Sequence, residues 1–512
     1  MPRPERVPTS GRSWITKTVR KGSTGEVTWT MSALGLVEGP SDATAAWSQI
    51  DWAKLHRHVS RLQARIVKAL KAGQWHRVRS LQRLLVNSFA AKLLAVKRVC
   101  SNRGKRTAGV DGIVLDTPEA RWRQAQQLNA KDYEPQPLRR IYIPKKNGKR
   151  RPLGIPTQAD RAEQALELLA LDPVAEHLAD TCSYGFRRER STQDAMAGCF
   201  LSLCRRHSAQ WILEGDIRGC FDELSHAWLL DHLPTQKGKL RAWLKAGFME
   251  RGAFHPSADG TPQGGIISPT AANRALDGLE GLLQVRFKGR HKVNLVRYAD
   301  DFIITGATQT LLAEEVKPLV AQFLRDRGLV LSEEKTRIVH IDEGFDFLGF
   351  NLRKYHGKLL IKPAKASIAA VKGKIRAIIK AGGSLPQDAL IRQVNPVIRG
   401  WGGYYRHVVS KQVFGDIDHA IWRMTWIWAK RRHPRKGLQW IKDRYFAHRD
   451  GRDWVFTDGS VTLFWMASIP IRRHVKIRGE ANPYDPDWAA YFRRRYVRLG
   501  KPTPNILHGL SP

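Results

Sequence analysis

Two adjacent aspartates, Asp300 and Asp301, end the short segment Tyr-Ala-Asp-Asp in the middle of the chain. Aliphatic and β-branched residues dominate both neighbouring stretches, 293–297 and 302–306. This pattern predicts a tight β-hairpin with the two acids at its tip. Carboxylates at the end of a rigid strand suit Mg²⁺, which prefers oxygen ligands and shares its shell with substrate phosphates. The alternative for these residues is an ordinary surface turn, where Asp is common.

A third acid, Asp216, directly follows the apolar stretch 211–215, which we interpret as a buried strand. Metal-catalysed nucleotide polymerisation uses two ions roughly 4 Å apart, and two acids from one hairpin are too few to fix both. We therefore expect Asp216 to complete the site with Asp300 and Asp301. An acid in such a strand without a partner would be costly. The alternative is that Asp216 caps a following helix, since Asp is a favourable N-cap residue.

A basic hairpin is a candidate for holding a triphosphate. Residues 140–144 and 151–155 are predicted strands on either side of a turn rich in Lys and Arg. Lys145 and Arg151 lie on opposite arms of this turn, so both can reach one triphosphate, Lys as a point charge and Arg as a fork. A solvated basic turn with no ligand is the alternative.

Three more residues are candidates for nucleotide contacts. Phe221 could lie under the incoming sugar and exclude a 2′-OH, although ordinary core packing is the common role of Phe. Gln263 belongs to a loop, 261–269, whose glycines allow close approach of backbone to a ligand, but a simple turn fits equally well. Lys335 is predicted near a strand start, where a surface lysine is the alternative.

The chain is strongly basic, with 86 Lys and Arg against 47 Asp and Glu, a net charge of +39 and a pI of about 10.4. Such an excess favours a polyanionic partner, because neutralising phosphates dominates nucleic-acid affinity. We expect no membrane partner, since no apolar run is long enough to span a bilayer and no lipidation signal is present. Five cysteines without a Cys-x-x-Cys pair indicate reduced thiols in a cytosolic protein rather than a structural zinc site.

Apolar periodicity divides the chain into regions. An amphipathic helix is predicted from Trp52 to a stop at Gly73, and a second helix from Val78 to about Val99. Residues 351–450 hold 22 Lys and Arg but only 5 acids, with helical faces such as Phe414 to Trp428. We expect five regions: a flexible basic arm (1–45), an N-terminal helical extension (46–120), a mixed α and β region (121–350), a basic helical domain (351–450) and a basic C-terminal region (451–512).

The order of these features resembles the motif order of reverse transcriptases: a basic hairpin, Asp216 with Phe221, Pro-Gln-Gly, Tyr-Ala-Asp-Asp, Leu-Ser-x-x-Lys-Thr and Phe-Leu-Gly-Phe. More narrowly, the chain is similar to the group II intron-encoded reverse transcriptase/maturase family. A Gly-Val-Asp-Gly turn at 109–112 precedes the hairpin, and the run 143–156 matches the family's fingers motif. The basic stretch after Phe350, with Arg-Gly-Trp at 399–401, is similar to the family's thumb, or X, domain.

The resemblance implies an α+β right-hand polymerase fold, with fingers and palm over 121–350, an α-helical thumb over 351–450 and a DNA-binding region over 451–512. Asp216, Asp300 and Asp301 would be the catalytic acids that bind two Mg²⁺ ions. The residues implied to bind substrate are Lys145 and Arg151 for the triphosphate, Phe221 as the sugar gate, Gln263 in the nucleotide pocket, and Lys335, whose role is less defined.

The resemblance also implies an activity and its partners. The protein would be an RNA-directed DNA polymerase that uses dNTPs and an RNA template with a DNA primer. It would bind its group II intron RNA as a ribonucleoprotein, assist splicing and mobility, and engage target DNA. Its location would be the bacterial cytoplasm, in association with the nucleoid when it engages DNA.

One departure from the family pattern concerns the C-terminal end. Members with an endonuclease carry a His-Asn-His module with paired cysteines, whereas no cysteine follows Cys220 here, so we expect no endonuclease. Two other functions stay open. One is an RNA-binding splicing chaperone with a catalytically silent polymerase fold. The other is a different polymerase, either RNA-dependent RNA polymerase or another retroelement enzyme, although Phe221 argues against ribonucleotide use.

Overall fold

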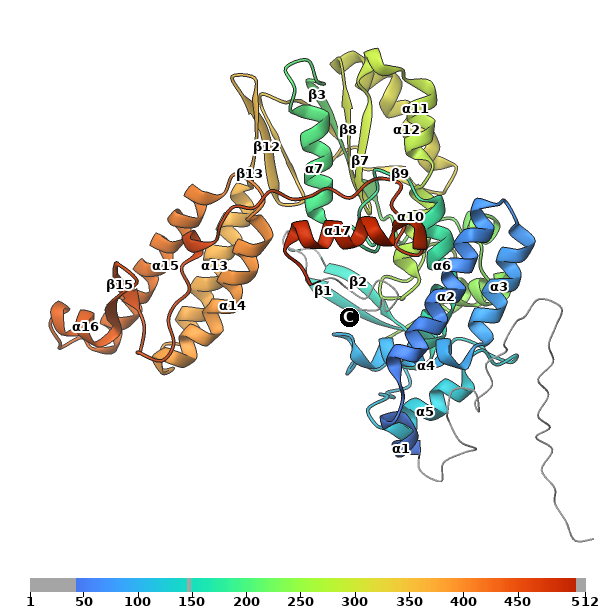
Figure 1. Cartoon of the computed structure of the whole chain (residues 1–512), viewed down its shortest axis with the longest axis horizontal. Coiled ribbons are helices and arrows are strands. Elements are labelled where there is room, and N and C mark those ends of the chain that lie inside the picture. The colour runs from blue at the N-terminus through green and yellow to red at the C-terminus, as the bar shows by residue number, and fades with distance from the viewer. Residues whose placement is uncertain (1–42, 145–147, 149, 503–512) are drawn as a thin grey trace, which may run out of the picture.

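A computed structural model describes residues 43–144, 148 and 150–502 of the protein. Most of the predicted arm (1–45), and Lys145 of the basic turn, therefore lie outside the described residues. Helices of the N-terminal region and helices of the thumb lie on opposite sides of a central mixed region (Figure 1). The fold is thus of the α+β type that was predicted.

The N-terminal region is a helical layer around one buried helix, α6 (Gln158–Leu178), which packs against α2, α3 and α4. The helix predicted from Trp52 is confirmed, and Asp51 caps it by accepting a hydrogen bond from the Lys54 N–H at 2.9 Å. The single helix predicted over 78–99 is wrong, because an extended Ser88 divides it in two. The helices are α1 (Ala43–Ser48), α2 (Trp52–Lys71), α3 (Trp75–Asn87), α4 (Phe89–Ser101) and α5 (Pro118–Gln127).

The fingers contain the predicted basic hairpin. Strands β1 (Leu138–Pro144) and β2 (Arg150–Ile155) pair in antiparallel register, with Ile143 opposite Arg151. Two short strands, β5 (Phe248–Glu250) and β6 (Ala253–His255), extend this sheet in the order β2-β1-β5-β6.

The palm is built on a four-stranded sheet in the order β10-β3-β8-β7. Both faces are buried: Ile212 and Ile303 enter one hydrophobic cluster, whereas Leu213 and Ile304 enter another. Apolar residues therefore occupy successive positions in the two central strands, as at Ile212 and Leu213 and at Ile303 and Ile304. The strands are β3 (Trp211–Gly215), β7 (Asn294–Tyr298), β8 (Asp301–Gly306) and β10 (Arg337–His340), with a separate short pair, β4 (Ile217–Arg218) and β9 (Val330–Leu331).

Helices cover the palm sheet and connect it to the fingers. They are α7 (Thr192–Leu203), α8 (His226–His232), α9 (Lys237–Lys245), α10 (Ser268–Leu276), α11 (Leu279–Arg286) and α12 (Lys317–Arg325). Within the described residues, no helix combines the length and apolar character needed to cross a bilayer. All five cysteines are free thiols, as the sequence indicated.

The thumb differs in one respect from the purely helical region predicted over 351–450. Strands β12 (Phe350–Tyr355) and β13 (Lys358–Pro363) form a sheet with β11 (Phe345–Phe347), so the predicted boundary at residue 350 falls inside a sheet. The predicted face of α15 is confirmed, with Phe414 and Trp428 buried. The remaining thumb elements are α13 (Lys365–Ala381), α14 (Gln387–Tyr405), α15 (Lys411–Arg432), α16 (Leu438–Tyr445), β14 (Phe446–Arg449) and β15 (Arg452–Phe456).

After the thumb the chain returns to the rest of the molecule. We call residues 470–499 the C-terminal strap; it ends in α17 (Ala489–Leu499), which lies across the middle of the molecule (Figure 1). The Arg472 N–H donates to the Arg406 carbonyl in the thumb at 2.9 Å. Further along, the Tyr484 hydroxyl donates to Asp172 of α6 at 3.2 Å. The strap therefore joins the thumb to the buried helix of the N-terminal region.

Candidate active site at the end of the palm sheet

The Tyr-Ala-Asp-Asp segment forms the predicted tight hairpin between β7 and β8. Tyr298 pairs with Asp301, which leaves Ala299 and Asp300 as the two turn residues. Ala299 has a φ of 58°, as two-residue hairpin turns require at their first position. The turn packs directly on a neighbouring loop, because a Cβ at Gly185 would lie 2.3 Å from the Ala299 nitrogen.

A buried arginine fixes the hairpin from behind. The Arg297 side chain is 1% exposed and forms an ion pair with Asp277 at 2.5 Å. It also donates to the Asn273 side-chain oxygen at 3.2 Å, and Asn273 in turn donates to the Gly185 carbonyl at 2.8 Å. Because Arg297 directly precedes Tyr298, this chain of contacts holds both the hairpin and the loop beneath it.

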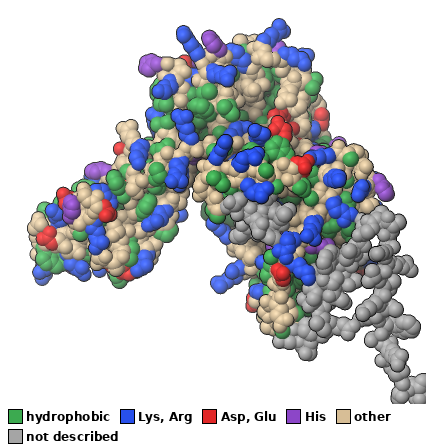
Figure 2. All heavy atoms as spheres, viewed as in Figure 1, with side chains coloured by type: hydrophobic (Ala, Val, Ile, Leu, Met, Phe, Trp, Pro, Cys, Tyr) green, Lys and Arg blue, Asp and Glu red, His purple; other side chains and the backbone are tan. Residues whose placement is uncertain are grey.

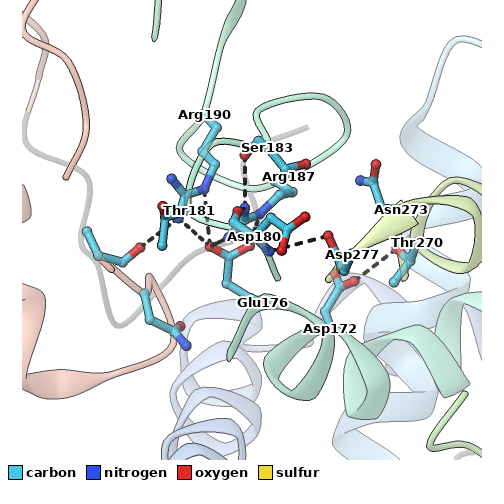
Figure 3. A network of polar contacts seen from close by, with 12 residues as sticks. Asp172, Glu176, Asp180, Thr181, Ser183, Arg187, Arg190, Thr270, Asn273 and Asp277 are labelled. Carbon is cyan, nitrogen blue, oxygen red and sulfur yellow. Dashed lines mark hydrogen bonds and ion pairs between the residues drawn. The ribbon is translucent and has the colours of Figure 1, made fainter. Parts of the chain in front are cut away.

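The loop beneath the hairpin is itself held by a polar network (Figure 3). Arg187 forms a bidentate pair with Glu176, with both distances 2.8 Å, and donates to the Ser183 carbonyl at 2.9 Å. Arg190 joins the same Glu176 carboxylate at 3.1 Å. Fork-to-carboxylate pairs of this kind fix orientation as well as distance. The network therefore gives the acidic hairpin a rigid base.

Strand β3 brings Asp216 to the same end of the sheet. Gly215 is paired with Phe302, so the next pair of residues in this register is Asp216 and Asp301. Only glycine fits at 215, since a Cβ there would lie 2.1 Å from the Phe302 ring. Residues 217–218 form a strand rather than a helix, so the helix-cap alternative for Asp216 is wrong. The structure thus brings the three predicted acids together.

The negative charges of the three carboxylates lie close enough to repel one another. Desolvation, followed by repulsion from Asp300 and Asp216, raises the pKa of Asp301 to about 6. The Lys335 ammonium forms an ion pair with Asp216 Oδ2 at 2.8 Å. Lys335 is therefore a predicted substrate-binding residue that directly contacts one of the three acids.

A carboxylate-only donor set is the chemistry that a hard divalent cation prefers. Within the described ranges, no three His, Cys, Asp or Glu side chains are gathered closely enough to hold an ion as they stand. Cys220 is a neighbour that the motif analysis did not assign to the site. Burial, then the charges of Asp300 and Asp222, raises the pKa of its thiol to about 12.

Fingers and palm enclose a cavity of about 370 Å³ that is lined by Phe221, Asp222 and Gln263, but by none of the three acids. The Gly154 N–H of β2 donates to the Gln263 carbonyl at 3.0 Å. Gly264, with a φ of 133°, allows this approach, since a Cβ there would lie 2.6 Å from the Gly154 carbonyl oxygen. The Gln263 side chain donates to Asp222 at 3.4 Å.

The two remaining predicted substrate-binding residues are not placed at this cavity. Arg151 is exposed on β2 and does not line this cavity, and Lys145 lies outside the described residues. Asp222 and Tyr142 do line the cavity but were not predicted as site residues. Asp222 could have been predicted from its position directly after Phe221. For Tyr142, the only indication in the sequence was the alternating pattern of its strand.

Three family models match the chain in order. The N-terminal domain of reverse transcriptase matches residues 47–128, reverse transcriptase (RNA-dependent DNA polymerase) matches 143–352, and the group II intron maturase-specific domain matches 368–446. Reverse transcriptases use divalent metal ions, and the maturase domain indicates RNA binding. The predicted hairpin, acids and basic helices all fall inside these matches.

Curated relatives agree with the models. Protein YkfC of Escherichia coli is 32% identical over 55% of this chain and 88% of its own length. The group II intron-encoded protein LtrA of Lactococcus lactis is 30% identical over 56% of this chain, and the match spans 59% of LtrA. A Candida tropicalis telomerase structure aligns at 11% identity over 59% of this chain and 63% of its own, with a TM-score of 0.37, too low to support a statement about fold.

The matched models, their order along the chain and the relatives point to one assignment. The right-hand fold, the acidic hairpin and the basic thumb agree with it. The chain belongs to the group II intron-encoded reverse transcriptase/maturase family.

Proposed function

We propose that this protein copies RNA into DNA at the end of its palm sheet, with Asp216, Asp300 and Asp301 holding two Mg²⁺ ions. The observation that carries the proposal is the β3–β8 register, which sets Asp216 beside Asp301 although the two are far apart in the sequence. The raised pKa of Asp301 supports it, because crowded carboxylates without enough counter-charge favour a cation.

The bound ions would activate the primer 3′-OH and neutralise the triphosphate. The chain's own residues would position the deoxynucleotide. Phe221 and Gln263 line one cavity between fingers and palm, and an aromatic ring under the sugar would exclude a 2′-OH. Lys145, Arg151 and Lys335 would contact phosphates, for which Arg offers a fork and Lys a point charge.

The second part of the proposal concerns RNA. The thumb would grip the cognate group II intron RNA as a ribonucleoprotein and so assist splicing and mobility, since residues 351–450 carry 22 Lys and Arg against 5 acids. Basic side chains are spread over the visible face of the thumb and the palm (Figure 2). Residues 451–512 would add contacts to target DNA, and the protein would work in the bacterial cytoplasm, at the nucleoid when it engages DNA.

The test is a primer-extension assay with purified protein, Mg²⁺, dNTPs and an RNA template carrying a DNA primer. We expect cDNA from the wild type and none from Asp300→Asn. Glu214→Gln is the matched control, because Glu214 lies on β3 two residues before Asp216 but is paired with Arg337 at 2.8 Å. Splicing of the intron that encodes the protein should survive Asp300→Asn, since the RNA performs that chemistry.

One observation favours the alternative of a splicing chaperone with a silent polymerase fold. In the part of the chain that the structure describes, Asp216 is in an ion pair with Lys335 and no ready-made metal cluster is present. If the wild type makes no DNA with Mg²⁺ or Mn²⁺ yet promotes splicing, this alternative is correct.

A further inference from the structure

A cavity of about 550 Å³ opens in the thumb between α15 and residues 452–467. Several aromatic side chains line it, and they come from two stretches of the chain. Trp422 and His419 come from α15, Trp454 from β15, and Phe464 and Trp465 from the loop that follows. No residue of the polymerase site lines it, and neither the polymerase activity nor the family match assigns it a role.

Several of these rings pack against the hydrophobic core of the thumb and against one another. Trp422 and Trp454 meet edge to face, with centroids 5.9 Å apart and planes at 86°. His419 lies 5.6 Å from Trp422 at 30°. The indole N–H of Trp422 is buried without a hydrogen-bond partner among the described residues. A buried donor of this kind is costly to the fold.

The backbone at Trp454 is shaped in an unusual way. Ala447 pairs with Val455 and Arg449 with Arg452, so Asp453 and Trp454 together oppose a single residue in a β-bulge. Trp454 has a φ of 60°, which bulky side chains rarely adopt. Bulges of this kind re-aim side chains and concentrate near functional sites. The fold therefore strains its backbone at a tryptophan that lines the cavity.

The charge around the cavity is suited to a phosphate backbone. Arg452 lies over the Trp465 ring at 4.2 Å, and Lys442 lies over Trp454 at 5.0 Å. The two acids of the lining are already engaged. Asp418 accepts backbone N–H groups at 2.9 and 2.7 Å, and Asp453 contacts His448 at 2.8 Å. Arg452 interacts with Asp418, and Lys442 with Asp453, so a phosphate group would share each cation with a nearby acid.

We propose that this cavity binds one unstacked nucleobase of a single-stranded RNA segment. The base would stack on the exposed ring of Trp465, beside Trp422 and Trp454, while the flanking phosphates contact Arg452 and Lys442. The inference rests on the proposed RNA-binding role of the thumb and names the site where a base is held.

The test compares two probes, a twelve-nucleotide oligouridine RNA and an abasic oligomer with the same number of phosphates. Trp465 is 41% exposed, so Trp465→Ala can remove a ring without emptying the core. We expect this variant to bind oligouridine about tenfold more weakly, since one stacked base contributes roughly that much, and to bind the abasic oligomer as the wild type does. Trp454→Phe, which keeps a ring, should retain most of the affinity.

The matched control is Trp440→Ala. Trp440 is 40% exposed and also lies beneath a cation, Lys436 at 5.3 Å, but belongs to α16 outside the cavity. The Trp440→Ala variant should bind both probes as the wild type does. A second readout is photo-crosslinking with 5-iodouridine RNA, which should label peptides from 415–425 or 452–467.

Three outcomes would overturn the inference. One is a Trp465→Ala variant that binds both probes like the wild type, with crosslinks mapping elsewhere. Another is an equal loss for both probes, which would indicate a phosphate contact instead of a base. A third is a preference for oligothymidine DNA over oligouridine RNA that depends on Trp465. If the wild type binds neither probe, the RNA-binding role of the thumb itself is wrong.

Discussion

Two acidic clusters at the palm have opposite electrostatic character. At the sheet end, desolvation and the charges of Asp300 and Asp216 raise the pKa of Asp301 to about 6. At α7, where the C-terminal strap crosses, burial alone would raise the pKa of Asp194, but a hydrogen bond from His474 and the charge of Arg495 lower it to about 2. The distances to these partners are 2.8 and 2.9 Å.

Asp194 stabilises the fold, whereas the three acids at the sheet end are suited to binding a ligand. Asp194 is fully buried and saturated, since the Ile477 N–H also donates to it at 2.7 Å, so its role is to fasten the strap. Among the described residues, Lys335 is the cation recorded in an ion pair with the sheet-end acids, and it contacts Asp216. Under-neutralised acids of this kind are costly to the fold and are characteristic of functional sites.

The largest expected effect is on catalysis. Asp300→Asn removes a carboxylate that would bind metal, so cDNA synthesis should fall roughly a thousandfold or more. Thermal stability should stay the same or rise slightly, because one repelling charge is gone. Primer extension and calorimetry measure the two quantities. A variant that loses activity only because it unfolds would remove the distinction between the clusters.

The reverse result is expected at the strap. Asp194→Asn leaves Arg495 and His474 without their buried partner, so the free energy of unfolding should fall by roughly 3 kcal/mol. Urea denaturation measures this loss. Asp388→Asn is the control, because Asp388 is in an exposed ion pair with Arg392 at 3.7 Å and should change stability little. A fully stable Asp194→Asn would mean that the strap does not depend on this cluster.

The pH dependence of stability should have opposite signs at the two clusters. The depressed pKa of Asp194 contributes about 2 kcal/mol above pH 4, and this contribution is lost as the pH falls towards 2. The raised pKa of Asp301 stabilises the metal-free protein only at low pH, and that contribution is lost as the pH rises through 6. Comparing the wild type with Asp194→Asn and Asp301→Asn across pH 2–8 measures both. If both substitutions changed stability with the same dependence on pH, the expected difference between Asp194 and Asp301 would be contradicted.

The smallest effect concerns Lys335. Its side chain is 63% exposed, so Lys335→Met should change the free energy of unfolding by less than about 1 kcal/mol. The pKa of Asp301 should nevertheless rise further, because Lys335 lowers it at present. NMR titration of ¹³C-labelled aspartate follows this shift. Lys317→Met, at the Glu333 ion pair, should leave the Asp301 titration unchanged.

The sequence predicted what depends on local pattern. The hairpin around Asp300 and the α15 face were foreseen because residues spaced by two, or by three and four, carry their own signal. The split at Ser88 was missed, since apolar periodicity continues through it. The strap was missed for another reason. The contact between Asp194 and His474 joins residues 280 apart, and no local pattern encodes such a pairing.

The most direct test of the metal site is an anomalous-difference map from crystals of the wild-type protein soaked in Mn²⁺. We predict two peaks roughly 4 Å apart, with Asp216 and Asp301 among the ligands, and their loss in Asp300→Asn crystals. Full occupancy of Mn²⁺ elsewhere, with no peak at these carboxylates, would contradict the assignment.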